Sequence, residues 1–373
     1  MPNNIQRLFS QYQKRYPLCK KEKIVDLMLD DGVITFEIAK SIKSGTSLFL
    51  LDNYFNMNSN FSSDASILDL CGINLSKNNI PKTKFNRKIE YTSQPMTQGD
   101  CWLLSDINSL NYTEFGRKAI YDAICPDEDG SGGVTIKFKG SPLKQKNIHI
   151  TAAQIDQARK SGNYSDGDDD MIAFELATEI TFKKMVKQGI AQRKYSDEDI
   201  EQMGGKYRSY IFAGVETKDF SQYPISELLG IKTKKVDCFM AINESATAEK
   251  DKNNLFKYVS ENKNNISGWC AFLGEWGNKN SKNRIHDGHA YAIKTVTYGK
   301  NVVLTDPHYS NYDIVVPWKV FIEHIRDISF SFKNPQEKSR FEKNGLPKNY
   351  ESNLKKNNDE IMAFRKKFLQ KSK

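Results

Sequence analysis

The segment QGDCWLL at residues 98–104 places one cysteine where it could act as a nucleophile. Cys101 follows a glycine and an aspartate and begins a run of apolar residues with helical spacing. The N-terminus of a helix stabilises a thiolate through its dipole and its free N–H groups. Gly99 permits a sharp entry into this helix, Asp100 is a candidate N-cap acceptor, and Trp102 can seal one side against the core. The alternative is a cysteine that packs as a small hydrophobe.

A nucleophilic cysteine needs an imidazole as general base, and the chain offers five histidines. His289 is the best candidate, because it opens the β-type run HAYAIKTV and would therefore be held rigidly. Gly288 before it leaves room for a substrate. His286 lies in a polar loop, and His149 and His324 lack a comparable setting.

The base needs a group that fixes its tautomer, and this group should lie on an adjacent strand. Asp306 ends the apolar run NVVLT and stands directly before a proline. Its carboxylate could accept the N–H of His289. Asn311, five residues later, is the second candidate for the same role.

The elements expected around these residues change in character along the chain. Helical spacing follows Cys101 and returns in MIAFELATEITFKKMVKQGI at 171–190, whereas VTIKF at 134–138 alternates like a strand. The last third contains short β-type runs separated by turn residues: HAYAIKTV, NVVLT, YDIVV and DISFSF. This order predicts an α+β fold in which a helical half faces a sheet half.

Three segments in this order resemble calpain-type cysteine peptidases. They are QGDCWLLSDINSL, DGHAYAIK and VVLTDPHYSNYDIVVPWKVF, and a middle stretch from residue 164 is similar to bacterial members. The resemblance implies a papain-like fold with two lobes, a helical lobe with Cys101 and an antiparallel β lobe with His289. It covers a core of residues 86–332, between a helical extension at 1–85 and a basic helical or disordered tail at 333–373.

The chain departs from the family pattern near each catalytic position. The family has Asn where this chain has Asp306, and Trp where it has His308, so the hydrogen bond to His289 would be less shielded from water. The family also supplies an oxyanion donor from a glutamine six residues before the cysteine, a position occupied here by Pro95. A one-residue insertion would restore that role to Gln94, which we prefer over Gln98, with the Cys101 N–H as the second donor.

The family resemblance is the only basis for expecting calcium as a cofactor. The loop that begins at Asp127 has EF-hand-like spacing, but its twelfth position is Phe138 and not a bidentate glutamate. A second acidic run, Asp166–Asp170, lacks the glycine that such a loop needs. We interpret both as solvated acidic turns, and the sequence contains no dinucleotide, P-loop or H-E-x-x-H motif.

Composition sets the broad class of the protein. The 373 residues are 38% hydrophobic and carry a net charge of +9, of which residues 333–373 account for +7 through 12 basic and 5 acidic residues. An anionic partner is one option for this basic tail, and no motif predicts binding to nucleic acid. No apolar run is long enough to span a membrane. Six scattered cysteines and the lack of a secretory signal predict free thiols and a cytoplasmic location.

The sequence therefore predicts a thiol endopeptidase, a hydrolase that acts on protein or peptide substrates. Two alternatives stay open. One is a peptidase fold retained as a binding module with impaired catalysis, which the departures near the catalytic positions favour. The other is a transglutaminase-like acyl transferase, which also uses cysteine, histidine and aspartate. The wide separation of Cys101 and His289 in the sequence argues against this second alternative.

Overall fold

A computed structural model describes residues 83–371, except for 91, 96–98, 197, 200–209, 212–213, 244–246 and 278–283, together with isolated positions before residue 83. The chain divides into two compact units, Met1–Pro81 and Lys82–Lys373. The predicted helical extension at 1–85 and the oxyanion candidate Gln98 therefore lie outside the described residues, apart from those isolated positions and residues 83–85.

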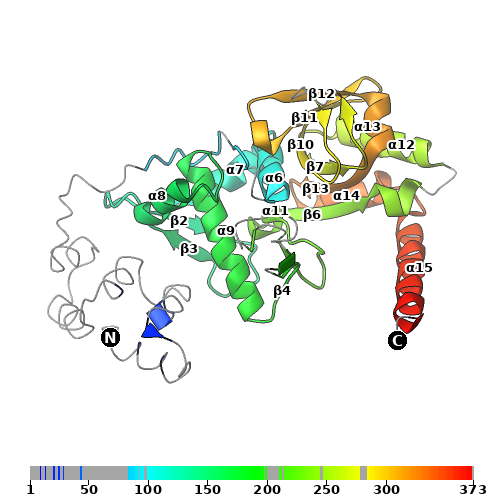
Figure 1. Ribbon diagram of the computed structural model, residues 1–373. Coiled ribbons are helices and arrows are strands. Elements are labelled where there is room, and N and C mark those ends of the chain that lie inside the picture. The colour runs from blue at the N-terminus through cyan, green and yellow to red at the C-terminus, as the bar shows by residue number, and fades with distance from the viewer. Residues whose placement is uncertain are drawn as a thin grey trace. The chain divides into compact units, whose positions relative to one another are not determined.

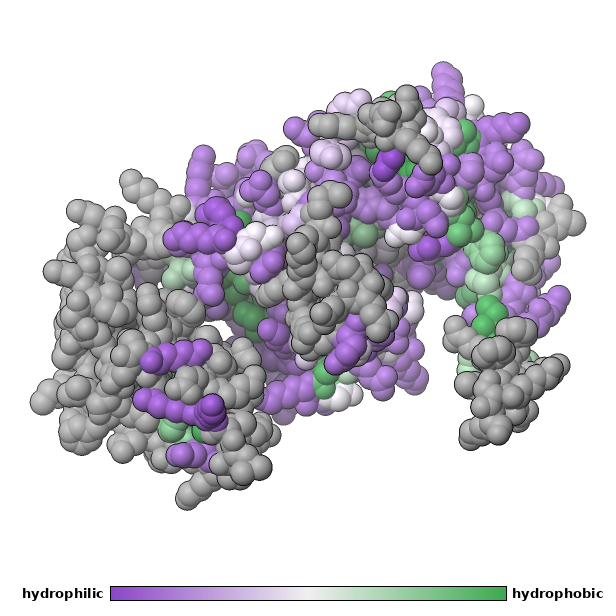
Figure 2. Space-filling view, in the orientation of Figure 1, coloured by the Kyte–Doolittle hydropathy of each residue, from purple (hydrophilic) through white to green (hydrophobic). Residues whose placement is uncertain are grey.

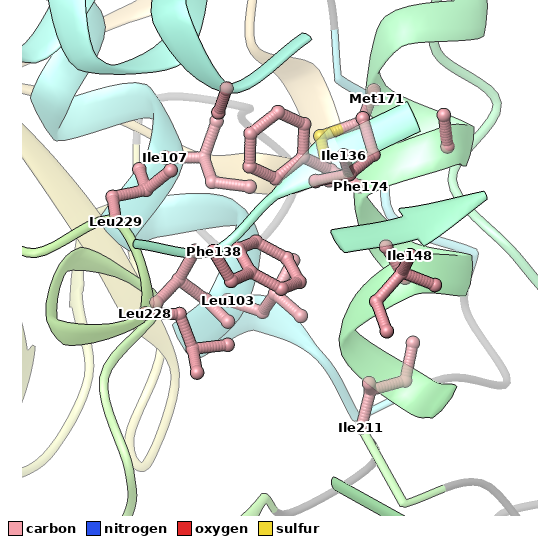
Figure 3. Close-up of a cluster of buried hydrophobic side chains, with 14 of the residues drawn as sticks. Leu103, Ile107, Ile136, Phe138, Ile148, Met171, Phe174, Ile211, Leu228 and Leu229 are labelled. Atoms are coloured by element: carbon pink, nitrogen blue, oxygen red, sulfur yellow. The ribbon is translucent and has the colours of Figure 1, made fainter. Parts of the chain in front are cut away.

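The N-terminal half of the second unit, residues 83–231, is mainly helical. Its elements are α6 (Cys101–Asn111), α7 (Glu114–Ala123), β1 (Ile124–Pro126), β2 (Val134–Lys137), β3 (Asn147–Ile150), α8 (Ala152–Ser161), α9 (Asp169–Lys187), β4 (Gln192–Arg193), β5 (Val215–Glu216) and α11 (Ile225–Leu228). Leu103 and Ile107 of α6 gather with Phe138 and with Phe174 of α9 in one buried cluster (Figure 3). The predicted helix at 171–190 is confirmed as α9, and the predicted strand at 134–138 as β2.

The C-terminal half, residues 232–371, is built on strands. Its elements are β6 (Lys232–Asp237), the π-helix η2 (Phe239–Asn243), α12 (Ala248–Glu261), β7 (Ile266–Phe272), β8 (Trp276–Gly277), β9 (Arg284–Ile285), β10 (Ala290–Thr297), β11 (Asn301–Thr305), the 3₁₀-helix η3 (Pro307–Tyr309), β12 (Asp313–Pro317), α13 (Trp318–His324), β13 (Ile325–Phe332), α14 (Pro335–Asn344) and α15 (Tyr350–Lys371). The four predicted strand runs correspond to β10, β11, β12 and β13.

Six strands of this half form one antiparallel sheet in the order β12-β11-β10-β7-β13-β6. Every residue of β7, one of the two central strands, is buried, and a second hydrophobic core covers the sheet. Because β10 and β11 are consecutive and antiparallel, the beginning of β10 lies beside the end of β11. The fold is thus α+β with antiparallel sheets, as the sequence predicts.

Helix α6 joins the two halves (Figure 1). It packs against β10 and β7 of the large sheet while its apolar side chains enter the first core. A buried polar chain reinforces this contact: the Asp106 carboxylate accepts from the backbone N–H and the hydroxyl of Ser226, at 3.0 and 2.6 Å. Ser226 Oγ is in turn 2.8 Å from Ser331 Oγ on β13. These hydrogen bonds tie the middle of α6 to the sheet half.

The basic tail forms helices that pack on the sheet half. Phe341 of α14 and Tyr350 of α15 are buried in the second core, and the Tyr350 hydroxyl accepts from the backbone N–H of Asp237 at 2.9 Å. Hydrophilic side chains cover most of the described surface seen in Figure 2. Among the described residues, no helix combines the length and the apolar character that crossing a membrane requires.

Candidate active site

Cys101 is the first residue of α6 and is half-buried. Its neighbour Trp102 anchors the helix, because the indole ring stacks on Phe182 and its N–H donates to the Ile211 carbonyl at 3.1 Å. The prediction that the Asp100 side chain caps the helix is wrong, because no such hydrogen bond forms. Asp100 has φ −99° and ψ 17° instead of the extended backbone of a side-chain cap.

Instead, Asp100 forms a buried carboxyl pair with Glu175 of α9. Burial raises the pKa of Asp100 to about 6, although its hydrogen bond with Glu175 opposes that rise. Burial, followed by the charge and the hydrogen bond of Asp100, raises the pKa of Glu175 well above its usual range. Burial and the Asp100 charge thus favour the protonated form of Glu175, which can share its proton with Asp100. The backbone N–H of Ser165 donates to Glu175 at 2.9 Å.

This pairing predicts opposite outcomes for two substitutions of Glu175. Glu175→Leu should lower the free energy of unfolding at pH 7 by about 3 kcal/mol, because it leaves the Asp100 carboxylate buried without a donor. Glu175→Gln keeps an N–H donor at this position and should cost less than about 1 kcal/mol. Urea denaturation of both variants measures the difference. Equal destabilisation by leucine and glutamine would contradict the shared proton.

His289 lies next to Cys101, directly before β10. Its Nε2 is 2.9 Å from Asp306 Oδ1, and its ring also hydrogen bonds to Cys101, for which Nδ1 remains available. Burial by itself would lower the pKa of His289, but the hydrogen bonds to Asp306 and Cys101 and their charges raise it to about 10. The ring is therefore an imidazolium at neutral pH. Gly288 has φ +69°, so the turn into β10 favours glycine there for its backbone.

Asp306 lies against the His289 imidazole at hydrogen-bonding distance. It follows β11, and its side chain is only 6% exposed. Burial would raise the pKa of Asp306, but the hydrogen bond and charge of His289, with the His308 N–H, lower it overall. Asn311, the other candidate, is exposed beyond η3. Of the two residues, Asp306 is thus the one that meets the imidazole.

His308 shields this hydrogen bond, contrary to the expectation from the missing tryptophan. Its ring stacks on His289 with a centroid distance of 4.9 Å and an interplanar angle of 11°, and the His289 side chain is only 12% exposed. Burial, followed by the charge of His289, lowers the pKa of His308. The ring is accordingly neutral at pH 7, and its Nδ1–H donates to the Gln94 carbonyl at 3.0 Å. A planar, uncharged imidazole thus covers one face of the His289 ring.

Backbone hydrogen bonds hold Gln94 at the same site. Its N–H donates to the Pro307 carbonyl at 2.9 Å, and its carbonyl accepts from His308. The neighbouring Ser93 carbonyl accepts from the backbone N–H of Asp166 at 2.9 Å. The segment before Cys101 is therefore held between the loop after β11 and the loop before α9, and Gln94 is buried there.

The acidic run at the start of α9 has a structural role in place of the predicted solvated turn. The Asp168 side chain caps α9 by accepting from the Met171 N–H at 2.9 Å. The carboxylates at positions 168–170 also accept backbone N–H groups from the segment before Gln94. These pairs are Asp168 with Glu90, Asp169 with Lys84 and Asp170 with Asn86. Asp169 also pairs with Arg159. The run thus fixes the chain that leads to Cys101.

The Asp127 side chain hydrogen bonds within its loop and to β3. Asp127 Oδ2 lies 2.8 Å from His149 Nε2 and 3.0 Å from Ser131 Oγ. Phe138, the twelfth residue, is fully buried in the first core and offers no oxygen ligand from its side chain. The Asp127 carboxylate is therefore engaged with a histidine and a serine.

Within the described part of the chain, one group could offer three ligands to a metal. His289, Asp306 and His308 have ligand atoms within 4.8 Å of one another. The two imidazole rings are stacked and nearly parallel, so their in-plane lone pairs do not converge on one point. Two imidazoles and a single carboxylate are also unlike the oxygen-rich set that calcium prefers. The geometry suits a hydrogen-bonded chain better than a metal site.

Comparisons with known proteins do not assign this chain to a family. No protein-family model matches the sequence, and a search of curated proteins finds no match. The chemistry of this site is therefore argued from its own residues.

Proposed function

We propose that this protein is a cysteine endopeptidase of the calpain type. In this proposal the two halves correspond to the two lobes of a papain-like fold, one supplying Cys101 and the other His289 and Asp306. The observation that carries the proposal is the hydrogen-bonded chain from Asp306 through His289 to a half-exposed cysteine at the first position of a helix. An imidazolium beside a thiol is the arrangement that activates a cysteine nucleophile.

The proposed reaction follows from the protonation of His289. The Cys101 thiolate attacks the carbonyl carbon of a peptide bond, and the carbonyl oxygen becomes an oxyanion. Gln94 and the Cys101 N–H are the proposed donors to that oxyanion. The His289 imidazolium gives its proton to the leaving amine as the C–N bond breaks, which leaves a thioester. Neutral His289 then takes a proton from water, and the resulting attack releases the acid and restores the thiolate.

Thiol labelling tests whether Cys101 is activated. With iodoacetamide at pH 7, we expect Cys101 to react at least about tenfold faster than Cys125, which is also half-buried. Cys238 and Cys270 should react slowly, because burial raises the pKa of both thiols, that of Cys238 to about 12. Peptide mass spectrometry resolves the sites.

The control for this labelling is the His289→Ala variant, in which the advantage of Cys101 over Cys125 should disappear. If Cys101 and Cys125 react equally fast in the unaltered protein, the cysteine is not activated. That outcome would favour the binding module over the peptidase.

A carboxylate at position 306 also keeps the acyl transferase as a second candidate, because such enzymes use Cys, His and Asp together. The two reactions differ in the acceptor of the acyl group, which is water for a peptidase and an amine for a transferase. Incubation with a glutamine-containing protein and dansylcadaverine distinguishes them. Cleaved chains without incorporated dansyl groups are the expected result.

A further inference from the structure

A pocket of about 940 Å³ lies at the other end of α6 from Cys101. Tyr112 and Thr113, which follow the last residue of α6, form part of its wall, and α7 and β2 of the N-terminal half supply more. The C-terminal half contributes Asn265, before β7, and Lys333, after β13, and these two are joined by a backbone hydrogen bond of 2.9 Å. Both halves of the unit therefore line one cavity, distinct from the candidate active site.

The side chains around this pocket are strongly basic. Five cations line it, against the two carboxylates Glu114 and Asp122, which gives a net charge of +3. The cations are Arg117, Lys118, Lys137, Lys139 and Lys333. Asp122 is shared by Lys118 at 3.1 Å and Lys139 at 3.5 Å. None of the ion pairs found among the described residues involves the other three cations.

The pocket lining also contains apolar residues. Leu229 and Ile231, in the link between the two halves, are buried apolar residues, and Ala119 and Ala123 of α7 lie beside them on the lining. A volume of this size is typical of small-molecule sites, which combine an apolar surface with a few placed polar groups. The cavity lining thus combines apolar side chains, charged side chains and the amide of Asn265.

We propose that this pocket binds a small organic anion that carries two or more phosphoryl groups. Arg117 and Lys137 would contact it from the N-terminal half and Lys333 from the C-terminal half. A phosphoryl group presents several strong acceptor oxygens, which suit both the guanidinium fork and the ammonium point charge. At least two such groups are needed, because the cations lie on elements of both halves and a single anion would leave the net charge uncompensated.

Binding of inorganic tripolyphosphate, used as the probe, tests this site. Isothermal titration calorimetry of the full chain should detect binding that weakens as salt is raised. Lys137→Gln and Lys333→Gln, one from each half, should each weaken it by about tenfold, as expected for one lost charge-assisted hydrogen bond. The double variant should then bind at least about 100-fold more weakly. The measurement needs no turnover, so it does not depend on the peptidase proposal.

A matched pair of lysines elsewhere controls for general charge effects. Lys257 and Lys348 are exposed and do not line the pocket, so the Lys257→Gln/Lys348→Gln variant should bind tripolyphosphate as the unaltered chain does. The probe should also raise the thermal midpoint of the unaltered chain but not that of Lys137→Gln/Lys333→Gln. Unchanged affinity in that double variant, equal losses in the two double variants, or no binding at millimolar probe would each overturn the proposal.

Discussion

Replacing His289 by alanine is expected to lower kcat/KM for peptide hydrolysis by roughly 10⁴-fold, the scale seen when a catalytic group of an acyl-transfer triad is removed. The imidazolium has two tasks in the proposed reaction: it stabilises the thiolate and it protonates the leaving amine. Alanine removes both tasks, together with the hydrogen bonds to Asp306 and Cys101. Release of fluorescent peptides from quenched casein measures the loss.

Two further variants make this result specific. Cys101→Ala should lose as much activity as His289→Ala, and the double variant should lose little more, because the two residues act as one unit. His324→Ala is the control, since His324 is half-buried outside the candidate site and its Nδ1 hydrogen bonds to the nearby Leu273 carbonyl at 3.1 Å. Losses that multiply in the double variant, or a comparable loss in His324→Ala, would refute a shared role for Cys101 and His289.

Local pattern was enough to predict the elements that carry these residues. The apolar spacing after Cys101 predicts a helix, and α6 begins at that residue. The run NVVLT predicts a strand that ends before Asp306, and β11 ends at Thr305. Once His289 opens one antiparallel strand and Asp306 follows the next, the hairpin brings the two side chains together. This part of the site is set by short-range periodicity and chain order.

The buried carboxyl pair could not be predicted in the same way. Asp100 has the residue type and position of an N-cap, so local preference favours a capping role. Its actual partner, Glu175, is on α9, and only the packing of α9 against α6 in the first core brings the two carboxyls together. A glutamate within an otherwise apolar helix face is the only signal in the sequence, and it does not name a partner.

The shielding of His289 shows how a family pattern can mislead about a single position. The absence of tryptophan predicts a more open hydrogen bond, but His308 also provides a flat ring, and Gln94 fixes its orientation. The acidic run Asp166–Asp170 likewise predicts a solvated turn, because the side chains of charge runs usually face water. Its carboxylates instead accept backbone N–H groups from a segment about 80 residues away. Both outcomes depend on tertiary contacts that periodicity does not encode.

The pH dependence of turnover should identify Asp306 as the orienting group. In the unaltered chain the pKa of His289 is raised to about 10, so the imidazolium persists as pH rises toward that value and activity falls only above it. Removing the carboxylate lowers this pKa, and the alkaline limb should therefore move to lower pH. We expect a displacement of roughly one to three pH units in Asp306→Ala, the range that one opposite charge produces. Profiles of kcat/KM between pH 5 and 10.5 measure it.

The Asp306→Asn variant tests the orientation of His289 separately from the negative charge at position 306. In Asp306→Asn the amide oxygen can still accept the His289 Nε2–H, so kcat/KM near pH 6 should fall by less than about tenfold, whereas Asp306→Ala should lose about 100-fold. Both variants should show the displaced alkaline limb, since both lack the negative charge. Asn311→Ala should leave rate and profile unchanged, because Asn311 is exposed beyond η3. If Asn311→Ala instead removes turnover while Asp306→Ala keeps it, the hydrogen bond between Asp306 and His289 does not orient the catalytic imidazole.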